Sequence, residues 1–184
     1  MTVVTTLPFS RPLTRADLED LPDDDGHRYE LIDGVLIVSP GPQLPHQDMV
    51  GNLYLLLRAA CPPHLKVVLA PFAVALADDT EVQPDLIVAA RTQFTRKELP
   101  GPPLLAVEVL SPSTRRIDLL LKRDRLQAAG VPSYWLVDPT GPSVTVLELQ
   151  DGAYVEAARA DGAQACEVLL PYPVRMVPQE LLDD

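Results

Sequence analysis

Apolar residues recur along the chain at two spacings, one typical of helices and one typical of strands. Helical spacing predicts a long helix over 44–60 and a second over 115–129, which Ser113 or Thr114 can cap. A shorter helix is expected over 14–21. The apolar stripe of the long helix consists of Met49, Val50, Leu53, Leu56, Leu57 and Ala60, and that of the second consists of Ile117, Leu120, Leu121 and Leu126. Asp118, Lys122 and Arg125 are expected on an adjacent face of the second helix.

Short aliphatic and β-branched runs, bounded by Pro, Gly and Asp, predict the strands. Asp33-Gly34 separates two such runs, 28–32 and 35–38, and so predicts a hairpin. Asp151-Gly152 predicts another hairpin, between 144–149 and 154–156. Further strands are expected at 66–70, 72–76, 85–89, 104–110 and 134–138. Helices and strands in this order predict an α/β (α+β) fold with a mixed central β-sheet flanked by helices.

The length of 184 residues is typical of one domain, so we expect a single domain over 1–184, with a core over about 14–150 and C-terminal strands to 184. No run approaches the roughly 18 apolar residues that a membrane span needs, and residues 1–10 lack the pattern of a signal peptide. Cys61 and Cys166 are too few for a disulfide framework or a cysteine-based zinc site. These features favour a reduced, cytoplasmic setting without a membrane partner.

Glu108 is the residue that most needs a chemical explanation. It lies in an otherwise apolar run, Leu104-Leu105-Ala106-Val107-Glu108-Val109-Leu110, which predicts a buried strand. An ionised carboxylate is rarely buried unless it is paired or bound to a metal, because its desolvation costs several kcal/mol or more. We therefore expect a compensating partner, for which a structural arginine and a divalent metal are the alternatives.

A second carboxylate and a lysine supply the other parts of a metal site. Asp85 begins the strand that follows Pro84, and Lys122 lies on the helix after Glu108. If the two strands are adjacent, Asp85 and Glu108 could hold Mg²⁺ or Mn²⁺, with the carbonyl of Val109 as a further oxygen ligand. Such an ion would neutralise phosphate charge and activate a water molecule. Lys122 would orient that water or stabilise the developing charge, and Glu30 is the candidate third carboxylate.

Each of these residues also has a structural interpretation. Asp85 follows a proline and can be a turn residue at the start of a strand, while Lys122 can be a solvated helix residue. Glu30 can form a cross-strand ion pair with Arg28 or another base. His46 lies near the start of the long helix, where it can either stabilise the helix or belong to the site.

The net charge of −11 argues against a strong, non-specific grip on nucleic acid, because phosphate binding needs Lys and Arg. The basic residues are unevenly distributed, however, since eight of the fifteen fall between 91 and 125. This distribution leaves room for a local basic patch beside the candidate site, and with it for DNA as a partner.

Four segments, in order along the chain, resemble the Uma-type endonuclease family of the restriction endonuclease-like, PD-(D/E)xK superfamily. The segments are 29–34, 83–86, 107–114 and 130–139, and the resemblance covers about 14–150. Asp85 and Glu108-Val109-Leu110 match the superfamily signature, with Leu110 at the usual position of the lysine. Lys122 resembles the variant in which that lysine lies on the following helix.

The resemblance implies a restriction endonuclease-like core and a Mg- or Mn-dependent nuclease that acts on DNA. The catalytic residues that it implies are Glu30, His46, Asp85, Glu108 and Lys122. It also implies a homodimer, because many nucleases of this superfamily pair to cut both strands. Leu126 stands where the family often carries an aromatic residue, and we expect this departure to change packing rather than chemistry.

Three functions remain open at the level of the sequence. The first is a metal-dependent DNA endonuclease, and the second is a binding or assembly module that keeps the same fold without catalysis. The third, a metal hydrolase for a small phosphoester, would suit the negative net charge better than duplex DNA does. A serine hydrolase is disfavoured, because Ser111 and Ser113 do not lie in a Gly-x-Ser-x-Gly motif.

Overall fold

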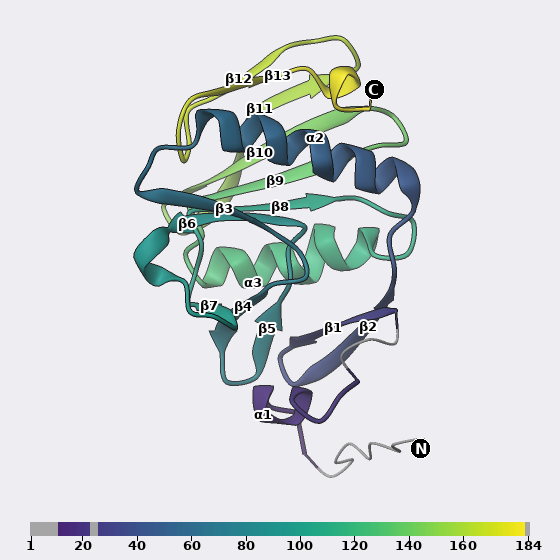
Figure 1. Ribbon diagram of the computed structural model, residues 1–184, viewed down its shortest axis with the longest axis vertical. Coiled ribbons are helices and arrows are strands. Elements are labelled where there is room, and N and C mark those ends of the chain that lie inside the picture. The colour runs from purple at the N-terminus through teal and green to yellow at the C-terminus, as the bar shows by residue number, and fades with distance from the viewer. Residues whose placement is uncertain (1–10, 23–25, 183–184) are drawn as a thin grey trace.

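A six-stranded mixed sheet forms the centre of the computed structural model, which describes residues 11–22 and 26–182 (Figure 1). The strand order is β11-β10-β9-β8-β6-β3. β8 and β9 run parallel, and the other neighbouring strands run antiparallel. The strands are β3 (Leu65–Leu69), β6 (Leu86–Ala90), β8 (Leu105–Val109), β9 (Ser133–Asp138), β10 (Ser143–Gln150) and β11 (Ala153–Asp161).

A second sheet of five strands has the order β2-β1-β5-β4-β7. Its strands are β1 (His27–Ile32), β2 (Val35–Pro40), β4 (Ala73–Ala77), β5 (Thr80–Val82) and β7 (Glu98–Pro100). The predicted hairpin at Asp33-Gly34 is confirmed, because β1 and β2 pair across it and both turn residues have positive φ, 52° and 72°. A Cβ at Gly34 would lie 2.6 Å from the Cβ of Pro12, so the close approach requires glycine there.

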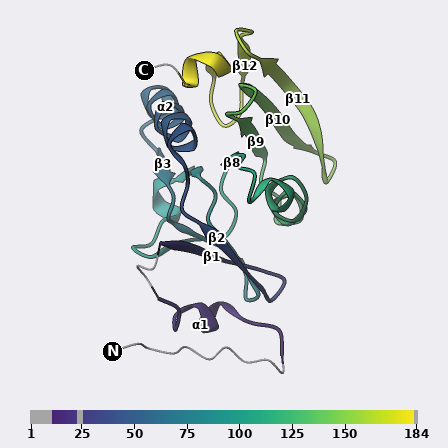
Figure 2. The same ribbon diagram turned by 90° about the vertical axis from the view of Figure 1, so that its right-hand side faces the viewer.

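Two helices cover opposite faces of the central sheet. α2 (Leu44–Ala60) packs on one face, and the helix formed by η2 (Ile117–Lys122) and α3 (Arg123–Ala128) packs on the other. Figure 2 looks along the second helix and shows β1 and β2 below it and β9 to β11 above. A short helix, α1 (Arg15–Leu18), precedes the first hairpin, and η1 (Arg91–Gln93) follows β6. Two flanking helices and a mixed central sheet confirm the predicted fold class.

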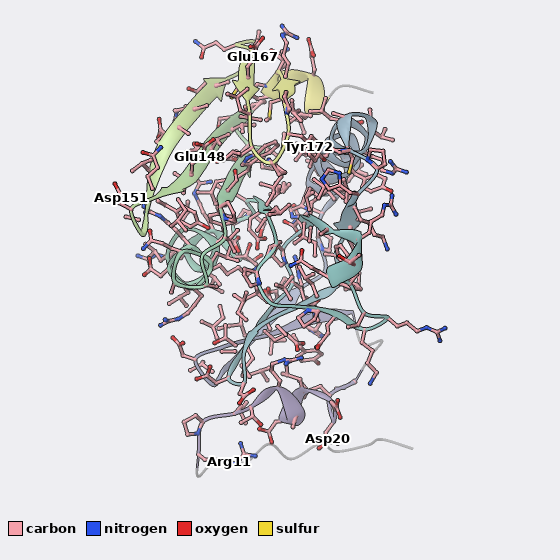
Figure 3. All side chains as sticks on the ribbon, turned by 90° about the vertical axis from the view of Figure 1, so that its left-hand side faces the viewer. Arg11, Asp20, Glu148, Asp151, Glu167 and Tyr172 are labelled. Atoms are coloured by element: carbon pink, nitrogen blue, oxygen red, sulfur yellow. The ribbon has the colours of Figure 1, made fainter. Side chains whose placement is uncertain are left out.

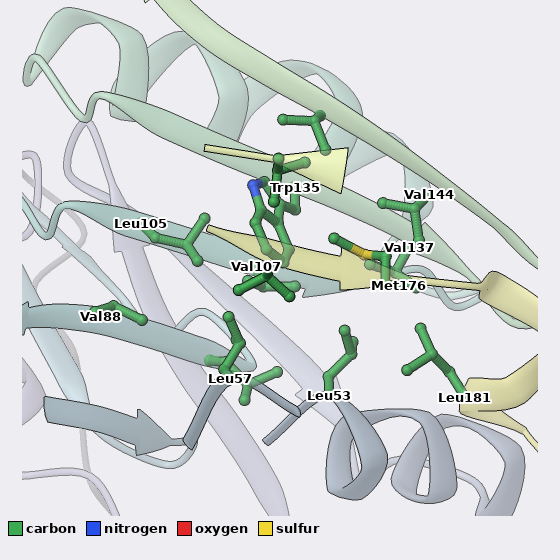
Figure 4. Packing of buried hydrophobic residues seen from close by; sticks show 14 of the residues in the cluster. Leu53, Leu57, Val88, Leu105, Val107, Trp135, Val137, Val144, Met176 and Leu181 are labelled. Carbon is green, nitrogen blue, oxygen red and sulfur yellow. The ribbon is translucent and has the colours of Figure 1, made fainter. Parts of the chain in front are cut away.

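The alternation of side chains in the central strands divides the core into two clusters. On β8, Leu105 and Val107 join the cluster on the α2 face, together with Trp135 of β9 (Figure 4). Val109 of β8 belongs to the same cluster. The intervening Ala106 belongs to the cluster on the α3 face. Successive strand residues point to opposite faces, so Glu108 must also point to the α3 face.

The C-terminal segment closes the α2 side of the core. β12 (Cys166–Val168) and β13 (Val174–Met176) pair with each other, and η3 (Pro178–Leu181) follows. The hydroxyl of Tyr172, which lies beside α2 in Figure 3, donates a hydrogen bond to the carbonyl of Leu57 at 2.8 Å. These contacts tie the chain beyond residue 150 to the same apolar cluster as α2.

The helix expected over 115–129 has an unforeseen π-helical stretch, η2, at its centre. The predicted apolar stripe is wrong there, because Leu120 and Leu121 are 59% and 46% exposed. Asp118 and Lys122 are buried instead, at 1% and 2% exposure. A π-helix has more residues per turn than an α-helix, so it rotates the side chains relative to the α-helical stripe.

Other differences concern the sheets and the short strands. The sequence predicts one central sheet, whereas strands β1, β2, β4, β5 and β7 form a sheet of their own. Strands β5 and β7 were not predicted, because each has three residues and gives no clear alternation. Strands β12 and β13 lie in the region where C-terminal strands were expected without bounds. Within the described ranges 11–22 and 26–182, the helices are too short or too polar to span a bilayer.

Candidate active site

Asp85 and Glu108 lie opposite each other on neighbouring strands of the central sheet. β6 and β8 are antiparallel, and Leu86 of β6 pairs with Val107 of β8. The next positions in this register are Asp85, just before β6, and Glu108. Glu108 points to the α3 face, whereas the carboxylate of Asp85 contacts His46 of α2. The condition set by the sequence analysis, that the two strands be adjacent, is therefore met.

Lys122 enters the same place from the helix on the α3 face. Its Nζ lies 2.9 Å from Oε1 of Glu108 and 2.9 Å from Oε1 of Glu30. All three side chains are 2% exposed. Strand β1, strand β8 and the helix thus each contribute one charged group to a single buried cluster.

Glu30 also links the two sheets. Its Oε1 accepts a hydrogen bond of 2.6 Å from the backbone N–H of Gln83, two residues before Asp85. Gln83 lies in the short segment between β5, which pairs with β1, and β6. Its hydrogen bond to Glu30 therefore ties the start of β6 to β1. Glu30 therefore positions both Lys122 and the turn that carries Asp85.

The carboxylate of Asp85 accepts hydrogen bonds from three sides. Arg28 donates to Oδ1 at 3.0 Å, and the backbone N–H of Val109 donates to Oδ2 at 2.8 Å. Nε2 of His46 lies 3.2 Å from Oδ2 and serves as a donor in the tautomer that carries its proton there. Burial acts to raise the pKa of Asp85, but His46 and Arg28 outweigh it and lower the pKa to about 2.

Asp118 is a site residue that the sequence analysis placed only on a helix face. Its Oδ1 lies 3.4 Å from Nζ of Lys122, one turn away on the helix, and the side chain is 2% exposed. Burial raises the pKa of Asp118, even though Lys122 acts to lower it. The π-helical stretch supplies this contact, and such stretches often occur at functional sites.

Charges do not balance in the cluster. The carboxylates of Glu30, Asp85, Glu108 and Asp118 are each at most 3% exposed. Lys122 and Arg28 are the fixed cations that contact them, which leaves an excess of two negative charges when all four acids are ionised. Buried charge is costly unless it is paired, so the cluster favours a bound divalent cation.

The pKa shifts of Glu108 and Lys122 also reflect the excess of negative charge in the cluster. Burial raises the pKa of Glu108 well above its usual value, and the carboxylates of Asp118, Asp85 and Glu30 add to the effect. Burial alone would lower the pKa of Lys122, but Glu108 and Glu30 outweigh it and raise that pKa. Lys122 is therefore a cation at neutral pH, and a metal ion bound to Glu108 would compete with the proton that burial favours on this carboxyl group.

The donors suit a magnesium-type site better than a zinc-type one. Among the residues that the structure describes, no three His, Cys, Asp or Glu side chains converge into a cage for a metal ion. Mg²⁺ needs only one or two carboxylates, because it keeps several of its waters. Asp85 and Glu108 can supply these two, since the hydrogen bond from Lys122 uses only Oε1 of Glu108.

Two adjoining pockets open beside the cluster. The first, of about 240 Å³, is lined by Arg28, His46 and Asp85 among others. The second, of about 420 Å³, shares Arg28 and His46 with the first and extends to the loop 111–114. We call the two pockets together the site groove. Asp85 is the cluster carboxylate that lines it, so a ligand would approach from the side of Arg28.

The structure brings together every side chain that the sequence analysis singled out for the site: Glu30, His46, Asp85, Glu108 and Lys122. Val109 contacts Asp85 through its backbone N–H. Arg28 and Asp118 were not assigned to the site from the sequence. For Asp118 a signal existed, because it lies four residues before Lys122 and so one helical turn away.

The expected basic patch is only partly available for binding. Arg115 forms an ion pair with Asp138, and Arg125 forms one with Asp33, each at 2.5 Å. These pairs neutralise part of the positive charge that the sequence places between 91 and 125.

Comparison with known proteins identifies the family and the fold of the chain. The family model described as "Uma2: Putative restriction endonuclease" matches residues 15–173. A solved structure, described as that of a putative nuclease belonging to DUF820 from Anabaena variabilis, is similar with a TM-score of 0.72. It is 20% identical in sequence, and the match covers 93% of this chain and 98% of that one. No curated protein shows significant sequence similarity.

Proposed function

The chain belongs to the Uma2 family of restriction endonuclease-like proteins, and we propose that it is a metal-dependent nuclease that hydrolyses DNA phosphodiester bonds at the buried carboxylate cluster. The observation that carries the proposal is the meeting of Asp85, Glu108 and Lys122 from three elements in a cluster with excess negative charge. A divalent cation and a phosphodiester are complementary to this arrangement, because the cation links the carboxylates to the phosphate oxygens.

Asp85 and Glu108 would hold Mg²⁺ or Mn²⁺, and the carbonyl of Val109 would be a further oxygen ligand. The bound ion would supply charge neutralisation at the phosphate and lower the pKa of a water molecule. His46 and Arg28 keep Asp85 ionised and oriented, since both donate to its carboxylate. Arg28 also faces the site groove and could contact a phosphate oxygen there.

Lys122 would act as a hydrogen-bond donor to the attacking water or to the phosphate oxygens. It cannot serve as the general base, because its carboxylate partners raise its pKa and keep it protonated. Glu30 and Asp118 hold the ammonium in place, at 2.9 and 3.4 Å from Nζ. The proton released by the water would pass to a carboxylate of the cluster or to solvent.

The proposal is tested by incubating supercoiled plasmid and single-stranded DNA with a series of divalent metals. We expect nicking with Mg²⁺ or Mn²⁺ and its loss in Asp85→Asn, Glu108→Gln and Lys122→Met. Matched controls are Glu167→Gln and Lys97→Met, which make the same chemical changes at exposed positions outside the cluster. Cleavage that persists in all three cluster variants would overturn the assignment.

Assays with a small phosphodiester and with Mn²⁺ distinguish the proposed nuclease from a small-phosphoester hydrolase and from a binding module. Turnover of bis(p-nitrophenyl) phosphate that competing DNA does not inhibit would favour a small-phosphoester hydrolase. Binding of Mn²⁺ to the cluster, measured by calorimetry, without turnover of any substrate would favour a binding module of the same fold.

A further inference from the structure

We propose that a second pocket, on the far side of the helix from the carboxylates, binds a backbone phosphate of the nucleic acid through Arg123. We call it the arginine pocket. It has a volume of about 400 Å³ and is lined by Arg115 and Arg123 of the helix and by Arg159 of β11, with Ser143 and Thr145 of β10. This inference rests on the proposed nuclease function and names a contact that would position the strand beside the site.

The helix directs these side chains away from the carboxylate cluster. Arg115, Leu119 and Arg123 follow one another at intervals of four residues and line the arginine pocket. Asp118 and Lys122, each one position earlier than a lining residue, point into the cluster. The helix therefore separates two sites of opposite charge, both on the same face of the central sheet.

Arg123 is the arginine of this pocket that is free to take a ligand. Arg115 is paired with Asp138, and Arg159 is paired with Asp161 at 3.2 Å. Within the described parts of the chain Arg123 has no ion pair, and its Nε is buried without a hydrogen-bond acceptor. A buried, unpaired donor on a charged group carries a desolvation cost that a bound anion would relieve.

The hydrogen-bond donors of the lining suit one phosphodiester group. Three arginines line the pocket together with the carboxylates of Asp138 and Glu156. Asp138 and Asp161 neutralise Arg115 and Arg159, which leaves Arg123 as the arginine without an ion pair among the described residues. A backbone phosphate carries one negative charge, and the hydroxyls of Ser143 and Thr145 offer neutral donors beside it. An arginine fork suits a phosphate better than a lysine does, because it donates two parallel hydrogen bonds.

The arginine pocket and the site groove adjoin each other. Leu110 lines both, and the loop residue Thr114 of the groove precedes Arg115 of the arginine pocket. On β9 and the loop after it, Asp138 lines the arginine pocket and Pro139 lines the groove. Figure 2 looks along the helix onto this end of the sheet, where β8 and β9 finish. One nucleic-acid strand could thus follow a surface from Asp85 past the start of the helix to Arg123.

The test is binding of a labelled oligonucleotide by fluorescence anisotropy over a salt series, without divalent metal, for the full chain and for Arg123→Gln. We expect the variant to bind several-fold more weakly, with a salt slope lower by about 1, because one phosphate contact is lost. Arg123→Lys should recover most of the salt slope but only part of the affinity. Arg58→Gln, at an exposed position of α2 on the opposite face of the central sheet, is the matched control for net charge.

Equal weakening by Arg123→Gln and Arg58→Gln would overturn the proposal, and so would the absence of binding by the full chain at about 50 mM salt. Thermal unfolding without nucleic acid should show that Arg123→Gln is no less stable than the parent protein. Hydrolysis of bis(p-nitrophenyl) phosphate should be unchanged in this variant. If the protein binds the oligonucleotide through Arg123 but does not cleave DNA with any metal, the result would support the arginine pocket and contradict the proposed nuclease activity.

Discussion

The ammonium of Lys122 lies 2.9 Å from the carboxylate of Glu108, and both side chains are 2% exposed. The two residues are 14 positions apart, in a strand and in the helix that follows it. Their contact explains how a glutamate can lie in an apolar strand. It explains only part of the charge, however, because Lys122 is shared with Glu30 and Asp118. The remaining negative charge is what makes the cluster a metal site in our proposal.

Removal of the lysine should destabilise the fold as well as stop cleavage. Lys122→Met leaves the carboxylates of Glu30, Glu108 and Asp118 without their shared cation, and breaking a buried ion pair from one side costs about 3–5 kcal/mol. Urea unfolding at pH 7 would measure the loss. Lys97→Met, at an exposed position, should change the free energy of unfolding by less than about 0.5 kcal/mol. A cluster variant as stable as this control would contradict the buried ion-pair network.

The free energy of unfolding without metal should fall as the pH rises above about 4.5. Burial raises the pKa of Glu108 above its usual value of 4.5, so the folded chain holds this proton more tightly than the unfolded chain does. The associated stability is fully present below pH 4.5 and is lost as the pH rises through the folded pKa.

Other groups of the cluster do not cancel this trend. Asp118 has a raised pKa and acts in the same direction, while Asp85, with a pKa of about 2, titrates below this window. Chemical unfolding in chelator from pH 4.5 to 8.5 would measure the slope. Glu108→Gln should flatten it, and an unchanged slope in that variant would argue against titration of Glu108.

Divalent metal should reverse the pH trend. Binding replaces the proton on Glu108, so the affinity for Mn²⁺ should rise with pH and binding should release protons. A free metal concentration 100 times the Kd stabilises a folded protein by about 2.7 kcal/mol. Calorimetry in two buffers of different ionisation enthalpy would count the protons. Stabilisation by Mn²⁺ that survives in Asp85→Asn with Glu108→Gln would place the metal elsewhere.

Neutralising Asp118 should make the metal-free protein more stable at pH 8. Burial raises the pKa of this carboxylate, although Lys122 and a hydrogen bond from Thr114 act to lower it. Asp118→Asn removes a charge that is more costly in the folded than in the unfolded state. The denaturation midpoint should rise at pH 8 and change less at pH 4.5. Asp124→Asn, on the exposed side of the same helix, is the control.

Much of the fold was predictable from local patterns. The two Asp-Gly hairpins, the α2 stripe and the strands around Asp85 and Glu108 all follow from residue spacing and turn chemistry. The family was predictable too, from four short segments, and the match over 15–173 confirms it. The second sheet was not, because the pairing of β1 with β5 joins Leu31 to Glu81 and depends on contacts distant in sequence.

The candidate site was also predictable only in part. Asp85 and Glu108 were predicted as site residues because each is an isolated acid in an apolar strand. Lys122 was predicted because it follows them on the next helix. The burial of Lys122 was not predictable, because an α-helical spacing puts Leu121 where the π-helical stretch puts Lys122. Local spacing cannot show where the helical period changes.

The sequence by itself therefore determined that Asp85 and Glu108 carry charge into the core, since their apolar strand neighbours leave these acids nowhere else to lie. Only the tertiary structure decided how those charges are shared. Arg28 and His46 form hydrogen bonds with Asp85. Lys122 forms ion pairs with three carboxylates. The reason is physical: burial depends on local pattern, whereas electrostatic compensation depends on distances between groups that only the folded chain brings together.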